Sequence, residues 1–148
     1  MNNKIPPPIV TLISGLAIYF SRNLFPDHYE LILDFFSILL LIGGIIIIRT
    51  AFLSFKNHQT TINPLNLTKT SSLVNTGIFK YTRNPMYLGM VFILLSIALK
   101  FNLYGGLIVI LLFFSFITKF QIIPEEKAME KLFGQEFKNY KKTTRRWL

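Results

Sequence analysis

Between Asp34 and Glu125 the chain runs for 90 residues without a single aspartate or glutamate. A soluble domain carries about 25% charged residues, whereas here only 16% of the 148 residues are charged and 51% are hydrophobic. A water-soluble fold would have too few charged side chains to cover the surface that this stretch contributes. The stretch therefore predicts a protein that lies within a membrane.

The basic balance of the chain agrees with this interpretation. Sixteen lysines and arginines against seven acids give a net charge of +9. In a chain this apolar we expect the partner to be anionic membrane lipid rather than nucleic acid. The absence of cysteine excludes disulfides, thiolate metal sites and cysteine nucleophiles. His58 has no second ligand at metal-binding spacing, so we expect no metal.

Four apolar segments organise the chain, and none shows the polar face that a helix of a soluble bundle requires. A spanning helix needs about 20 residues, a length that these segments reach when Lys, Arg and Ser at their ends extend toward water. We expect an all-α membrane protein forming a single domain over residues 1–148, with about four transmembrane helices and a C-terminal amphipathic cytoplasmic helix. The membrane helices are expected at about 9–25, 35–55, 86–99 and 103–123, and the cytoplasmic helix at about 125–141.

Charge placement predicts how these helices are oriented. Of the 16 lysines and arginines, 14 lie in the N-terminus, in or beside the connection after the second helix, or in the C-terminal tail; only Arg22 and Lys100 lie elsewhere. Because cytoplasmic connections carry the excess of basic residues, both termini and the 56–83 connection are expected to face the cytoplasm. Lys4 and the first apolar run resemble a signal peptide, but residues 21–23 offer no small-residue cleavage site, so we expect an uncleaved helix.

The start of the third segment carries a first candidate site. Asn84 followed by Pro85 predicts a helix N-cap with proline at the first helical position. The free N–H groups of that helix start, with Arg83 beside them, would attract an anion such as a carboxylate. A plain helix cap with a topology-determining arginine explains the same residues, and on this segment alone it is the favoured interpretation.

The C-terminal segment carries a second candidate site. Pro124 predicts the start of a new helix whose first turn contains Glu125 and Glu126 and whose apolar residues recur at helical spacing. The two glutamates fall within the apolar arc of this helix, while its lysines fall on the opposite side. Unpaired buried carboxylates are costly, so we expect the pair to meet a cation, which is either Arg83 or a bound ligand.

Several motifs occur together in the second half of the chain. They are Ser72-Leu73-Val74-x-x-Gly77-x-Phe79-x-x-x-Arg83-Asn84-Pro85-Met86-Tyr87-x-Gly89, Glu125-Glu126, Phe133-Gly134-x-x-Phe137-x-x-Tyr140 and Arg145-Arg146-Trp147. In this combination they resemble the superfamily of isoprenylcysteine carboxyl methyltransferases and phospholipid methyltransferases. The resemblance covers about residues 56–147, and the first two helices carry no recognisable signature.

The resemblance implies an integral membrane enzyme that uses S-adenosylmethionine and lacks the soluble Rossmann-type fold. In that superfamily the cofactor lies at the cytoplasmic ends of the last helices, and a lipidic substrate enters from the bilayer. By position, the implied cofactor-binding residues are Leu73, Val74 and Phe79 at the adenosine end, together with Asn84, Pro85, Met86, Tyr87 and Glu125. Arg83 and Glu126 are the implied catalytic residues near the methyl acceptor, where Glu126 would take a proton from an amine or a thiol.

The methyl acceptor is a lipidic or small hydrophobic molecule in this prediction, and its class stays open between a carboxylate, an amine and a thiol. Prenylcysteine-type members of the superfamily have histidine at the position of Asn84. At the position of Gln121 they have an arginine that holds the substrate carboxylate. Gln121 is therefore the implied substrate-binding residue, and its identity disfavours methylation of a prenylcysteine carboxylate.

Two other functions fit the same membrane architecture. Sterol-reductase-type proteins share a related helical layout, which leaves an NADPH-dependent membrane reductase as an alternative, although the basic cluster expected for the 2′-phosphate is missing. A non-catalytic small membrane subunit would explain the helices and the charge asymmetry but not the inward-facing Glu125-Glu126 pair. Methyl transfer itself requires mainly alignment and the exclusion of water, so we expect few reactive side chains.

Overall fold

The computed structural model describes residues 5–26, 30–58 and 72–148, and within these ranges the chain is helical and contains no strand. The α-helices of these ranges are α1 (Pro7–Phe20), α2 (Leu31–Asn57), α3 (Pro85–Phe101), α4 (Leu103–Ile117) and α5 (Ile123–Thr143). The shorter elements are the 3₁₀-helices η1 (Arg22–Leu24) and η2 (Gly77–Lys80) and the π-helix η3 (Thr118–Ile122). The predicted all-helical fold is therefore confirmed.

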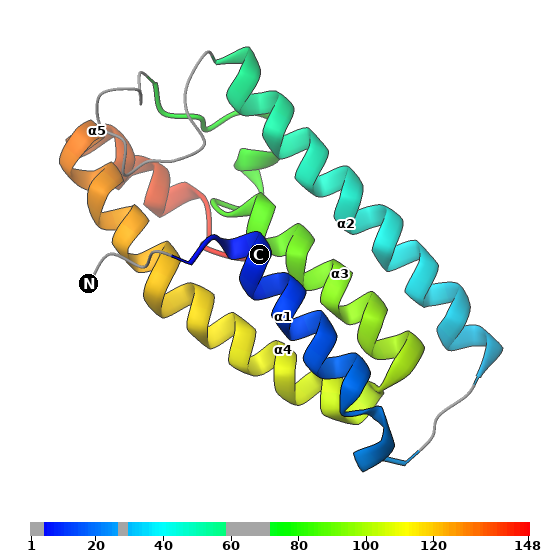
Figure 1. The fold of residues 1–148 in the computed structure, drawn as a ribbon. Helices are drawn as coiled ribbons and strands as arrows, with labels where there is room; N and C mark the ends of the chain where they lie inside the picture. The colour runs from blue at the N-terminus through cyan, green and yellow to red at the C-terminus, as the bar shows by residue number, and fades with distance from the viewer. Residues whose placement is uncertain (1–4, 27–29, 59–71) are drawn as a thin grey trace.

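Helix α3 lies at the centre of the bundle. It packs along α2 on one side and against α1 and α4 on the other, as Figure 1 shows. The main core forms where α1, α3 and α4 meet, and it includes Ile18, Leu94 and Ile117, whose side chains are fully buried. α2 packs mainly on α3 and η2, so most of its large apolar side chains are exposed.

Two glycines bring the backbones of α2 and α3 into direct contact. A Cβ atom at Gly44 would lie 2.7 Å from the carbonyl oxygen of Gly89, and one at Gly89 would lie 2.8 Å from that of Gly44. Small residues at helix crossings allow such a close approach, which is common between helices in membranes. The crossing fixes α2 beside the N-terminal half of α3, the half that carries the candidate site.

Among the helices that the structure describes, two are long and apolar enough to cross a membrane by length and composition. They are α2, with 27 residues, and the continuous helix Leu103–Thr143, with 41 residues. α1 and α3 have 14 and 17 residues, fewer than the roughly 20 residues of a full span. Four complete transmembrane helices therefore stay a prediction.

The first two helix boundaries differ from those predicted. α1 ends at Phe20 rather than near residue 25, and the chain continues through η1 to Phe25, whose backbone is extended. The extended conformation follows from Pro26, because the residue before a proline is disfavoured in a helix. α2 begins at Leu31, earlier than predicted, so that Asp34 lies in its first turn.

The helix start predicted at Pro124 is confirmed, because α5 begins at Ile123 with Pro124 in its first turn, but this helix is not separate from the one before it. α4, η3 and α5 form one continuous helix, and Pro124 lies in its interior. The π-turn of η3 comes directly before this proline, and a locally widened helix accommodates a residue that has no N–H to donate. Glu125 and Glu126 therefore lie in the first turn of α5 as predicted, on an extension of the fourth helix beyond its apolar part.

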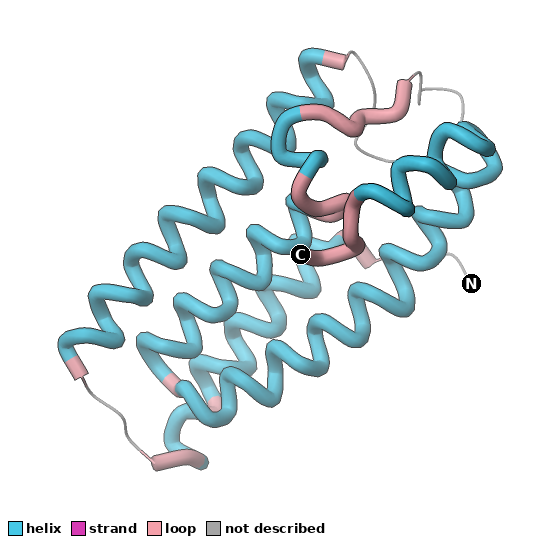
Figure 2. The backbone as a smooth tube through the Cα atoms, turned by 180° about the vertical axis from the view of Figure 1, so that it is seen from behind, coloured by secondary structure: helices cyan, strands magenta, loops and turns pink. Residues whose placement is uncertain are grey.

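Helix α5 bends sharply at Gly134, where φ is 49° and ψ is −117°. Glycine adopts this conformation readily, whereas a residue with a Cβ atom is strained in it. Beyond the bend, the second part of α5 runs back across the end of the bundle toward the start of α3, as Figures 1 and 2 show. The predicted single amphipathic helix over 125–141 is thus corrected to two segments.

The bend gathers the polar segments of the chain at one end of the bundle. Figure 2 shows the loops before α3 and after α5 side by side at this end. At the opposite end, Lys100 and Asp34 form an ion pair of 2.9 Å between α3 and α2. Lys4 and Lys69, which the charge count includes, lie outside the described residues, and the orientation of the bundle in a membrane stays a prediction.

Candidate active site

Arg83 and Glu126 form an ion pair that links the start of α3 to the first turn of α5. Arg83 Nη2 lies 2.8 Å from Glu126 Oε1, and the two side chains are 9% and 11% exposed. Arg83 comes just before the N-cap of α3, and Glu126 follows the π-turn closely. From the sequence, the inward-facing glutamates were expected to meet either Arg83 or a bound ligand. In the structure, Arg83 is a partner of Glu126.

A second arginine binds the same carboxylate. Arg146 donates from Nε to Glu126 Oε1 at 3.1 Å and from Nη2 to Oε2 at 2.7 Å, a bidentate arrangement. Burial alone would raise the pKa of Glu126, but the hydrogen bonds and positive charges of Arg146 and Arg83 outweigh burial and hold this pKa below its usual value. Glu126 is thus an ionised anchor, and a carboxylate held in this way is a weak proton acceptor.

The cluster of Arg83, Arg146 and Glu126 carries one positive charge in excess. Arg83 Nη1 donates to the carbonyl oxygens of Thr144 and Lys141. Arg83 Nε, in contrast, is buried and has no hydrogen-bond partner among the described residues. A buried donor without a partner costs about 1–3 kcal/mol. The excess charge and the unpartnered donor both suit a bound anion.

Glu125 makes a different set of contacts. Its Oε1 accepts a hydrogen bond of 2.7 Å from the hydroxyl of Tyr87, in the first turn of α3. Among the described residues, no lysine or arginine forms an ion pair with it. Burial raises the pKa of Glu125 to about 7, the hydrogen bond from Tyr87 opposes this rise, and the charge of Glu126 adds to it. Glu125 therefore changes protonation near neutral pH and is suited to accept a proton or bind a cation.

The start of α3 lies where the sequence predicts it, but the side chain of Asn84 does not cap the helix. Asn84 occupies the N-cap position and Pro85 the first turn, yet the side chain of Asn84 makes no capping hydrogen bond. Its Nδ2 donates instead to the carbonyl oxygen of Arg146 at 2.9 Å. Pro85 is fully buried, and Met86 packs against an apolar cluster that includes residues of α5.

Leu73, Val74 and Phe79 belong to that same apolar cluster. All three are buried, and they pack with Phe137 and Tyr140 from the second part of α5. The hydroxyl of Tyr140 donates to the carbonyl oxygen of Phe79 at 2.6 Å, and burial raises the pKa of that hydroxyl. These contacts fix the segment before α3 against α5. The implied role of the three residues at an adenosine group stays a prediction.

Gln121 lies in the π-turn and is buried. Its Nε2 donates to the carbonyl oxygen of Ile5 at 2.9 Å, which ties the segment before α1 to the junction of α4 and α5. Among the described residues it forms no hydrogen bond to Arg83 or to either glutamate of the pair. Its implied contact with a substrate stays a prediction.

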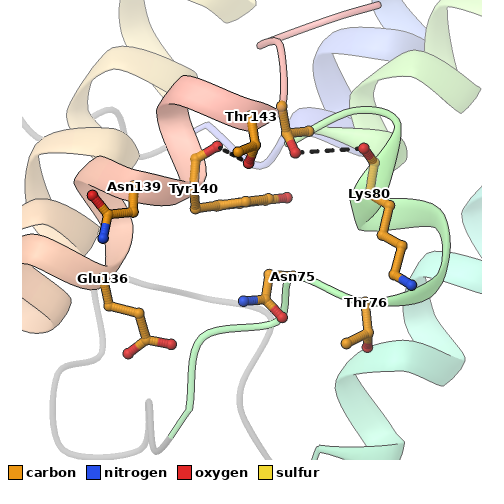
Figure 3. A pocket seen from close by; sticks show the side chains of 8 residues that line it. Asn75, Thr76, Lys80, Glu136, Asn139, Tyr140 and Thr143 are labelled. Carbon is orange, nitrogen blue, oxygen red and sulfur yellow. Dashed lines mark hydrogen bonds between the residues drawn. The ribbon is translucent and has the colours of Figure 1, made fainter.

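An open cleft of about 490 Å³ lies at the same end of the bundle. Asn75, Thr76 and Lys80 line one side of it, and Figure 3 shows Glu136 and Asn139 on the α5 side. Thr144 also lines the cleft, and the carbonyl oxygen of Thr144 accepts a hydrogen bond from Arg83. Thr144 is thus the link between the cleft and Arg83, whereas Arg83, Arg146, Glu125 and Glu126 themselves do not line the cleft.

His58 follows the end of α2 and makes two contacts through its ring. Nδ1 lies 2.8 Å from the carbonyl oxygen of Ser54, and Nε2 lies 3.3 Å from Thr76 Oγ1. The ring thus connects α2 to the segment before η2. In the part of the chain that the structure describes, no three His, Asp or Glu side chains gather in a way that would hold a metal ion.

Sequence reasoning missed the ion pair of Arg146 and the role of Thr82. Thr82 is 1% exposed and donates to the carbonyl oxygen of Arg146, which lies 64 positions away in the sequence. Both residues lie in irregular segments, where no hydrophobic periodicity marks the buried positions. Two features of the sequence indicated Arg146. The two inward-facing glutamates had only one candidate arginine, Arg83, so a second cation was needed. Arg146 also belongs to the Arg145-Arg146-Trp147 motif.

Comparison with known proteins supports the resemblance that the motifs carry. A family model described as phospholipid methyltransferase matches residues 33–136, more than two thirds of the chain. A protein of Haemophilus influenzae, described as uncharacterized, is 38% identical over 63 residues, which make up 43% of this chain and 100% of that relative. No solved structure matches the chain.

The family match covers most of the residues on which the site is built, although Arg146 lies beyond its end. Arg83, Tyr87, Glu125 and Glu126 all lie within it. The match favours methyl transfer over the NADPH-dependent reductase and the non-catalytic subunit, and the two long apolar helices agree with an association with membranes. The chain belongs to the phospholipid methyltransferase family and is a membrane-associated methyltransferase.

Proposed function

We propose that this protein transfers a methyl group from S-adenosylmethionine to the amine of a lipid at the membrane surface. The observation that carries the proposal is the distribution of charge in the site. The cluster of Arg83, Arg146 and Glu126 has an excess positive charge and an unpartnered donor, and Glu125 stands beside it without a described cationic partner. The cluster suits a carboxylate, and Glu125 suits a protonated amine.

The residues of the site fit S-adenosylmethionine. Arg83 Nε would donate to the α-carboxylate of the cofactor, and that carboxylate would balance the excess charge of the cluster. The cleft beside Thr144 has a volume of about 490 Å³, which is within the range of small-molecule pockets. When bound, the cofactor supplies a methyl group on its sulfonium sulfur, which passes to the acceptor nitrogen and leaves S-adenosylhomocysteine.

The geometry favours exchanging the two roles that the resemblance implies for the glutamates. Glu126 is held by two arginines, so it orients Arg83 and stays ionised. Glu125 has a pKa of about 7 and a hydrogen bond from Tyr87, so it is the better group to remove a proton from a lipid ammonium. The proton moves to the Glu125 carboxylate, and the nitrogen lone pair is then free to form the new bond to carbon.

An amine is favoured over a carboxylate as the acceptor because the described site has no uncommitted cation to hold a second carboxylate. Arg83 and Arg146 share Glu126, and Arg83 Nε is assigned to the cofactor. Gln121, which stands where related enzymes have an arginine, donates to a backbone carbonyl oxygen. A carboxylate needs no base, whereas an ammonium must lose a proton before it reacts, and Glu125 provides this function.

We also infer that the site lies at the cytoplasmic surface of the membrane. In this arrangement α2 and the apolar part of the Leu103–Thr143 helix cross the bilayer with the shorter α1 and α3, and both termini face the cytoplasm. Most of the basic residues lie in the segments at the end of the bundle that holds the site, which supports this orientation. S-adenosylmethionine would then reach the cleft from the cytoplasm, and the lipid would reach Glu125 from the bilayer.

A calorimetric titration of the purified protein tests the proposed cofactor. S-adenosylmethionine and S-adenosylhomocysteine should both bind, because the proposed contact with Arg83 uses the carboxylate that they share. NADPH should give no binding signal. Binding of NADPH without binding of S-adenosylmethionine would favour the reductase alternative instead.

A further inference from the structure

Residues 144–148, here called the strap, cross the start of α3 and are fixed there by successive carbonyl oxygens. The carbonyl oxygen of Thr144 accepts from Arg83 Nη1, and that of Arg145 accepts from the backbone N–H of Arg83 at 3.0 Å. The carbonyl oxygen of Arg146 accepts from Asn84 Nδ2 at 2.9 Å and from Thr82 Oγ1 at 3.3 Å. The strap is therefore bound directly to the residues that precede α3.

Trp147 anchors the strap on its other side. Its ring stacks on Phe114 of α4 with a centroid distance of 4.3 Å. Its Nε1 donates to Thr118 Oγ1 in the π-turn at 3.3 Å. Arg146 thus stands between two anchors, one at the start of α3 and one at the junction of α4 and α5, so its side chain is held over Glu126.

The way in which Arg146 holds Glu126 determines what Arg83 can do. An arginine and a carboxylate pair most strongly through two parallel hydrogen bonds. Arg146 has formed that arrangement and occupies both oxygens of Glu126, while Arg83 contributes a single bond from Nη2 to Oε1. Without Arg146, Glu126 would be free to pair with Arg83 through both Nη2 and Nε, and Nε would no longer be available to a ligand.

We propose that Arg146 is a positioning residue of this site, which keeps Arg83 Nε available to the cofactor carboxylate by occupying both oxygens of Glu126. This inference rests on the proposed function, because it assumes that S-adenosylmethionine binds at Arg83. It assigns to the strap a part in cofactor recognition that is separate from its packing on α3 and α4.

The test compares the affinities of two ligands by calorimetry. S-adenosylmethionine has the α-carboxylate, and decarboxylated S-adenosylmethionine lacks it. Arg146→Gln should lower the affinity for S-adenosylmethionine by about tenfold, as expected for losing one charge-assisted contact, and should change the affinity for the decarboxylated ligand less than about twofold. Arg146→Lys should show the same selective loss, because an ammonium keeps the positive charge but does not form the two parallel hydrogen bonds to Glu126.

Arg145→Gln is the matched control. Arg145 is exposed and its side chain has no ion-pair partner among the described residues, so this variant removes the same charge next to Arg146 without touching Glu126. It should leave both affinities unchanged. Thermal unfolding of each variant confirms that the folded protein is compared.

Four outcomes overturn the proposal and one supports it. Equal loss of affinity for both ligands, or full rescue by lysine, would show that Arg146 acts only through packing or through charge. The wild type could bind S-adenosylmethionine more tightly than the decarboxylated ligand while Arg146→Gln binds both as the wild type does. That result would refute the positioning role and leave the proposed function intact. A wild-type protein that does not bind S-adenosylmethionine would refute both. Selective loss with an unaffected Arg145→Gln control supports the assignment.

Discussion

Arg83 Nη2 and Glu126 Oε1 lie 2.8 Å apart, although the two residues are 43 positions apart in the sequence. Their contact joins the start of α3 to the helix that leaves the π-turn. Because the pair is buried and is shared with Arg146, it contributes both to the stability of this end of the bundle and to the charge that a ligand meets.

Replacing Glu126 with glutamine should destabilise the protein. The change leaves two arginines facing each other without their shared carboxylate, and removing one partner of a buried pair costs about 3–5 kcal/mol. We expect a loss of about 3 kcal/mol in the free energy of unfolding at neutral pH, measured by denaturant unfolding in detergent micelles. In the wild type, this contribution is lost as the pH falls below 4.5 and through the lowered pKa of Glu126.

Glu130→Gln is the control for this stability measurement. Glu130 pairs with Lys138 at 3.8 Å and with Lys141 at 3.4 Å on the exposed side of α5. Exposed pairs contribute about 0.2–1 kcal/mol, so this variant should remain close to the wild type. Equal losses for Glu126→Gln and Glu130→Gln would contradict the buried arginine cluster.

The pH dependence of methyl transfer should identify the proton acceptor. If Glu125 takes the proton, the single-turnover rate should rise with pH through about 7, because the carboxylate is active only when it is deprotonated. Glu125→Gln should remove this inflection and lower the rate by about 10²–10⁴-fold. Tyr87→Phe should move the inflection to higher pH, since the hydrogen bond from Tyr87 favours the ionised form of Glu125.

Tyr81→Phe provides the matched control for that experiment, because Tyr81 is 75% exposed. Its pH profile should coincide with that of the wild type. An inflection that stays in place in both Tyr87→Phe and Glu125→Gln would show that another group accepts the proton.

Replacing Arg83 with lysine separates its role in the site from a role in membrane orientation. Lysine preserves the positive charge that determines topology, but it cannot bind Glu126, the strap carbonyls and a ligand carboxylate at the same time. We expect Arg83→Lys to insert into membranes normally and to lose methyl transfer by on the order of 10²-fold, equivalent to about two lost charge-assisted contacts. Arg49→Lys, at an exposed position of α2, should keep full activity.

The activity of the two arginine variants is compared with their affinity for S-adenosylmethionine in the same preparations. A loss in affinity would support the assignment of Arg83 to the cofactor carboxylate, and a loss in the single-turnover rate alone would place Arg83 at the acceptor. Wild-type affinity and turnover in Arg83→Lys would leave Arg83 as an interfacial anchor only.

Much of the helical architecture could be predicted, because long apolar segments and helix starts leave local signals. Asn84 and Pro85 mark the first residues of α3 as predicted. Pro124 marks the first turn of α5 as predicted, but it does not separate α5 from α4, because the π-turn before it accommodates a proline within a continuous helix. Gly134 could be read as a flexible point in the sequence, but the direction in which α5 bends depends on tertiary contacts.

The charged partners were predictable only in part. The two glutamates of α5 were expected to need a cation, and Glu126 has Arg83. The second partner, Arg146, comes from an irregular segment that reaches the site only because α5 bends and the strap crosses α3. Glu126 is an ionised anchor, whereas Glu125 titrates near neutral pH, and this difference arises from their different long-range contacts. Because the two residues are adjacent in the sequence, the sequence alone does not reveal the difference.

Single cysteines report the orientation of the bundle, because the chain has no cysteine of its own. Glu30→Cys lies at the start of α2, at the end of the bundle away from the site, and Lys142→Cys is exposed near the end of α5. In intact cells, an impermeant thiol reagent should label Glu30→Cys and should label Lys142→Cys only after the membrane is opened. Equal labelling of both in intact cells would contradict the proposed topology.

The most direct test of the account is the transfer of a labelled methyl group to lipid. Purified protein is incubated with methyl-labelled S-adenosylmethionine and vesicles that contain both phosphatidylethanolamine and oleic acid, and the extracted lipids are separated. We predict that the label appears in the amine lipid and that Glu125→Gln lowers its rate of appearance by about 10²–10⁴-fold. Label in the fatty acid, or label in the amine lipid that does not depend on Glu125, would contradict the proposed acceptor and the proposed proton transfer.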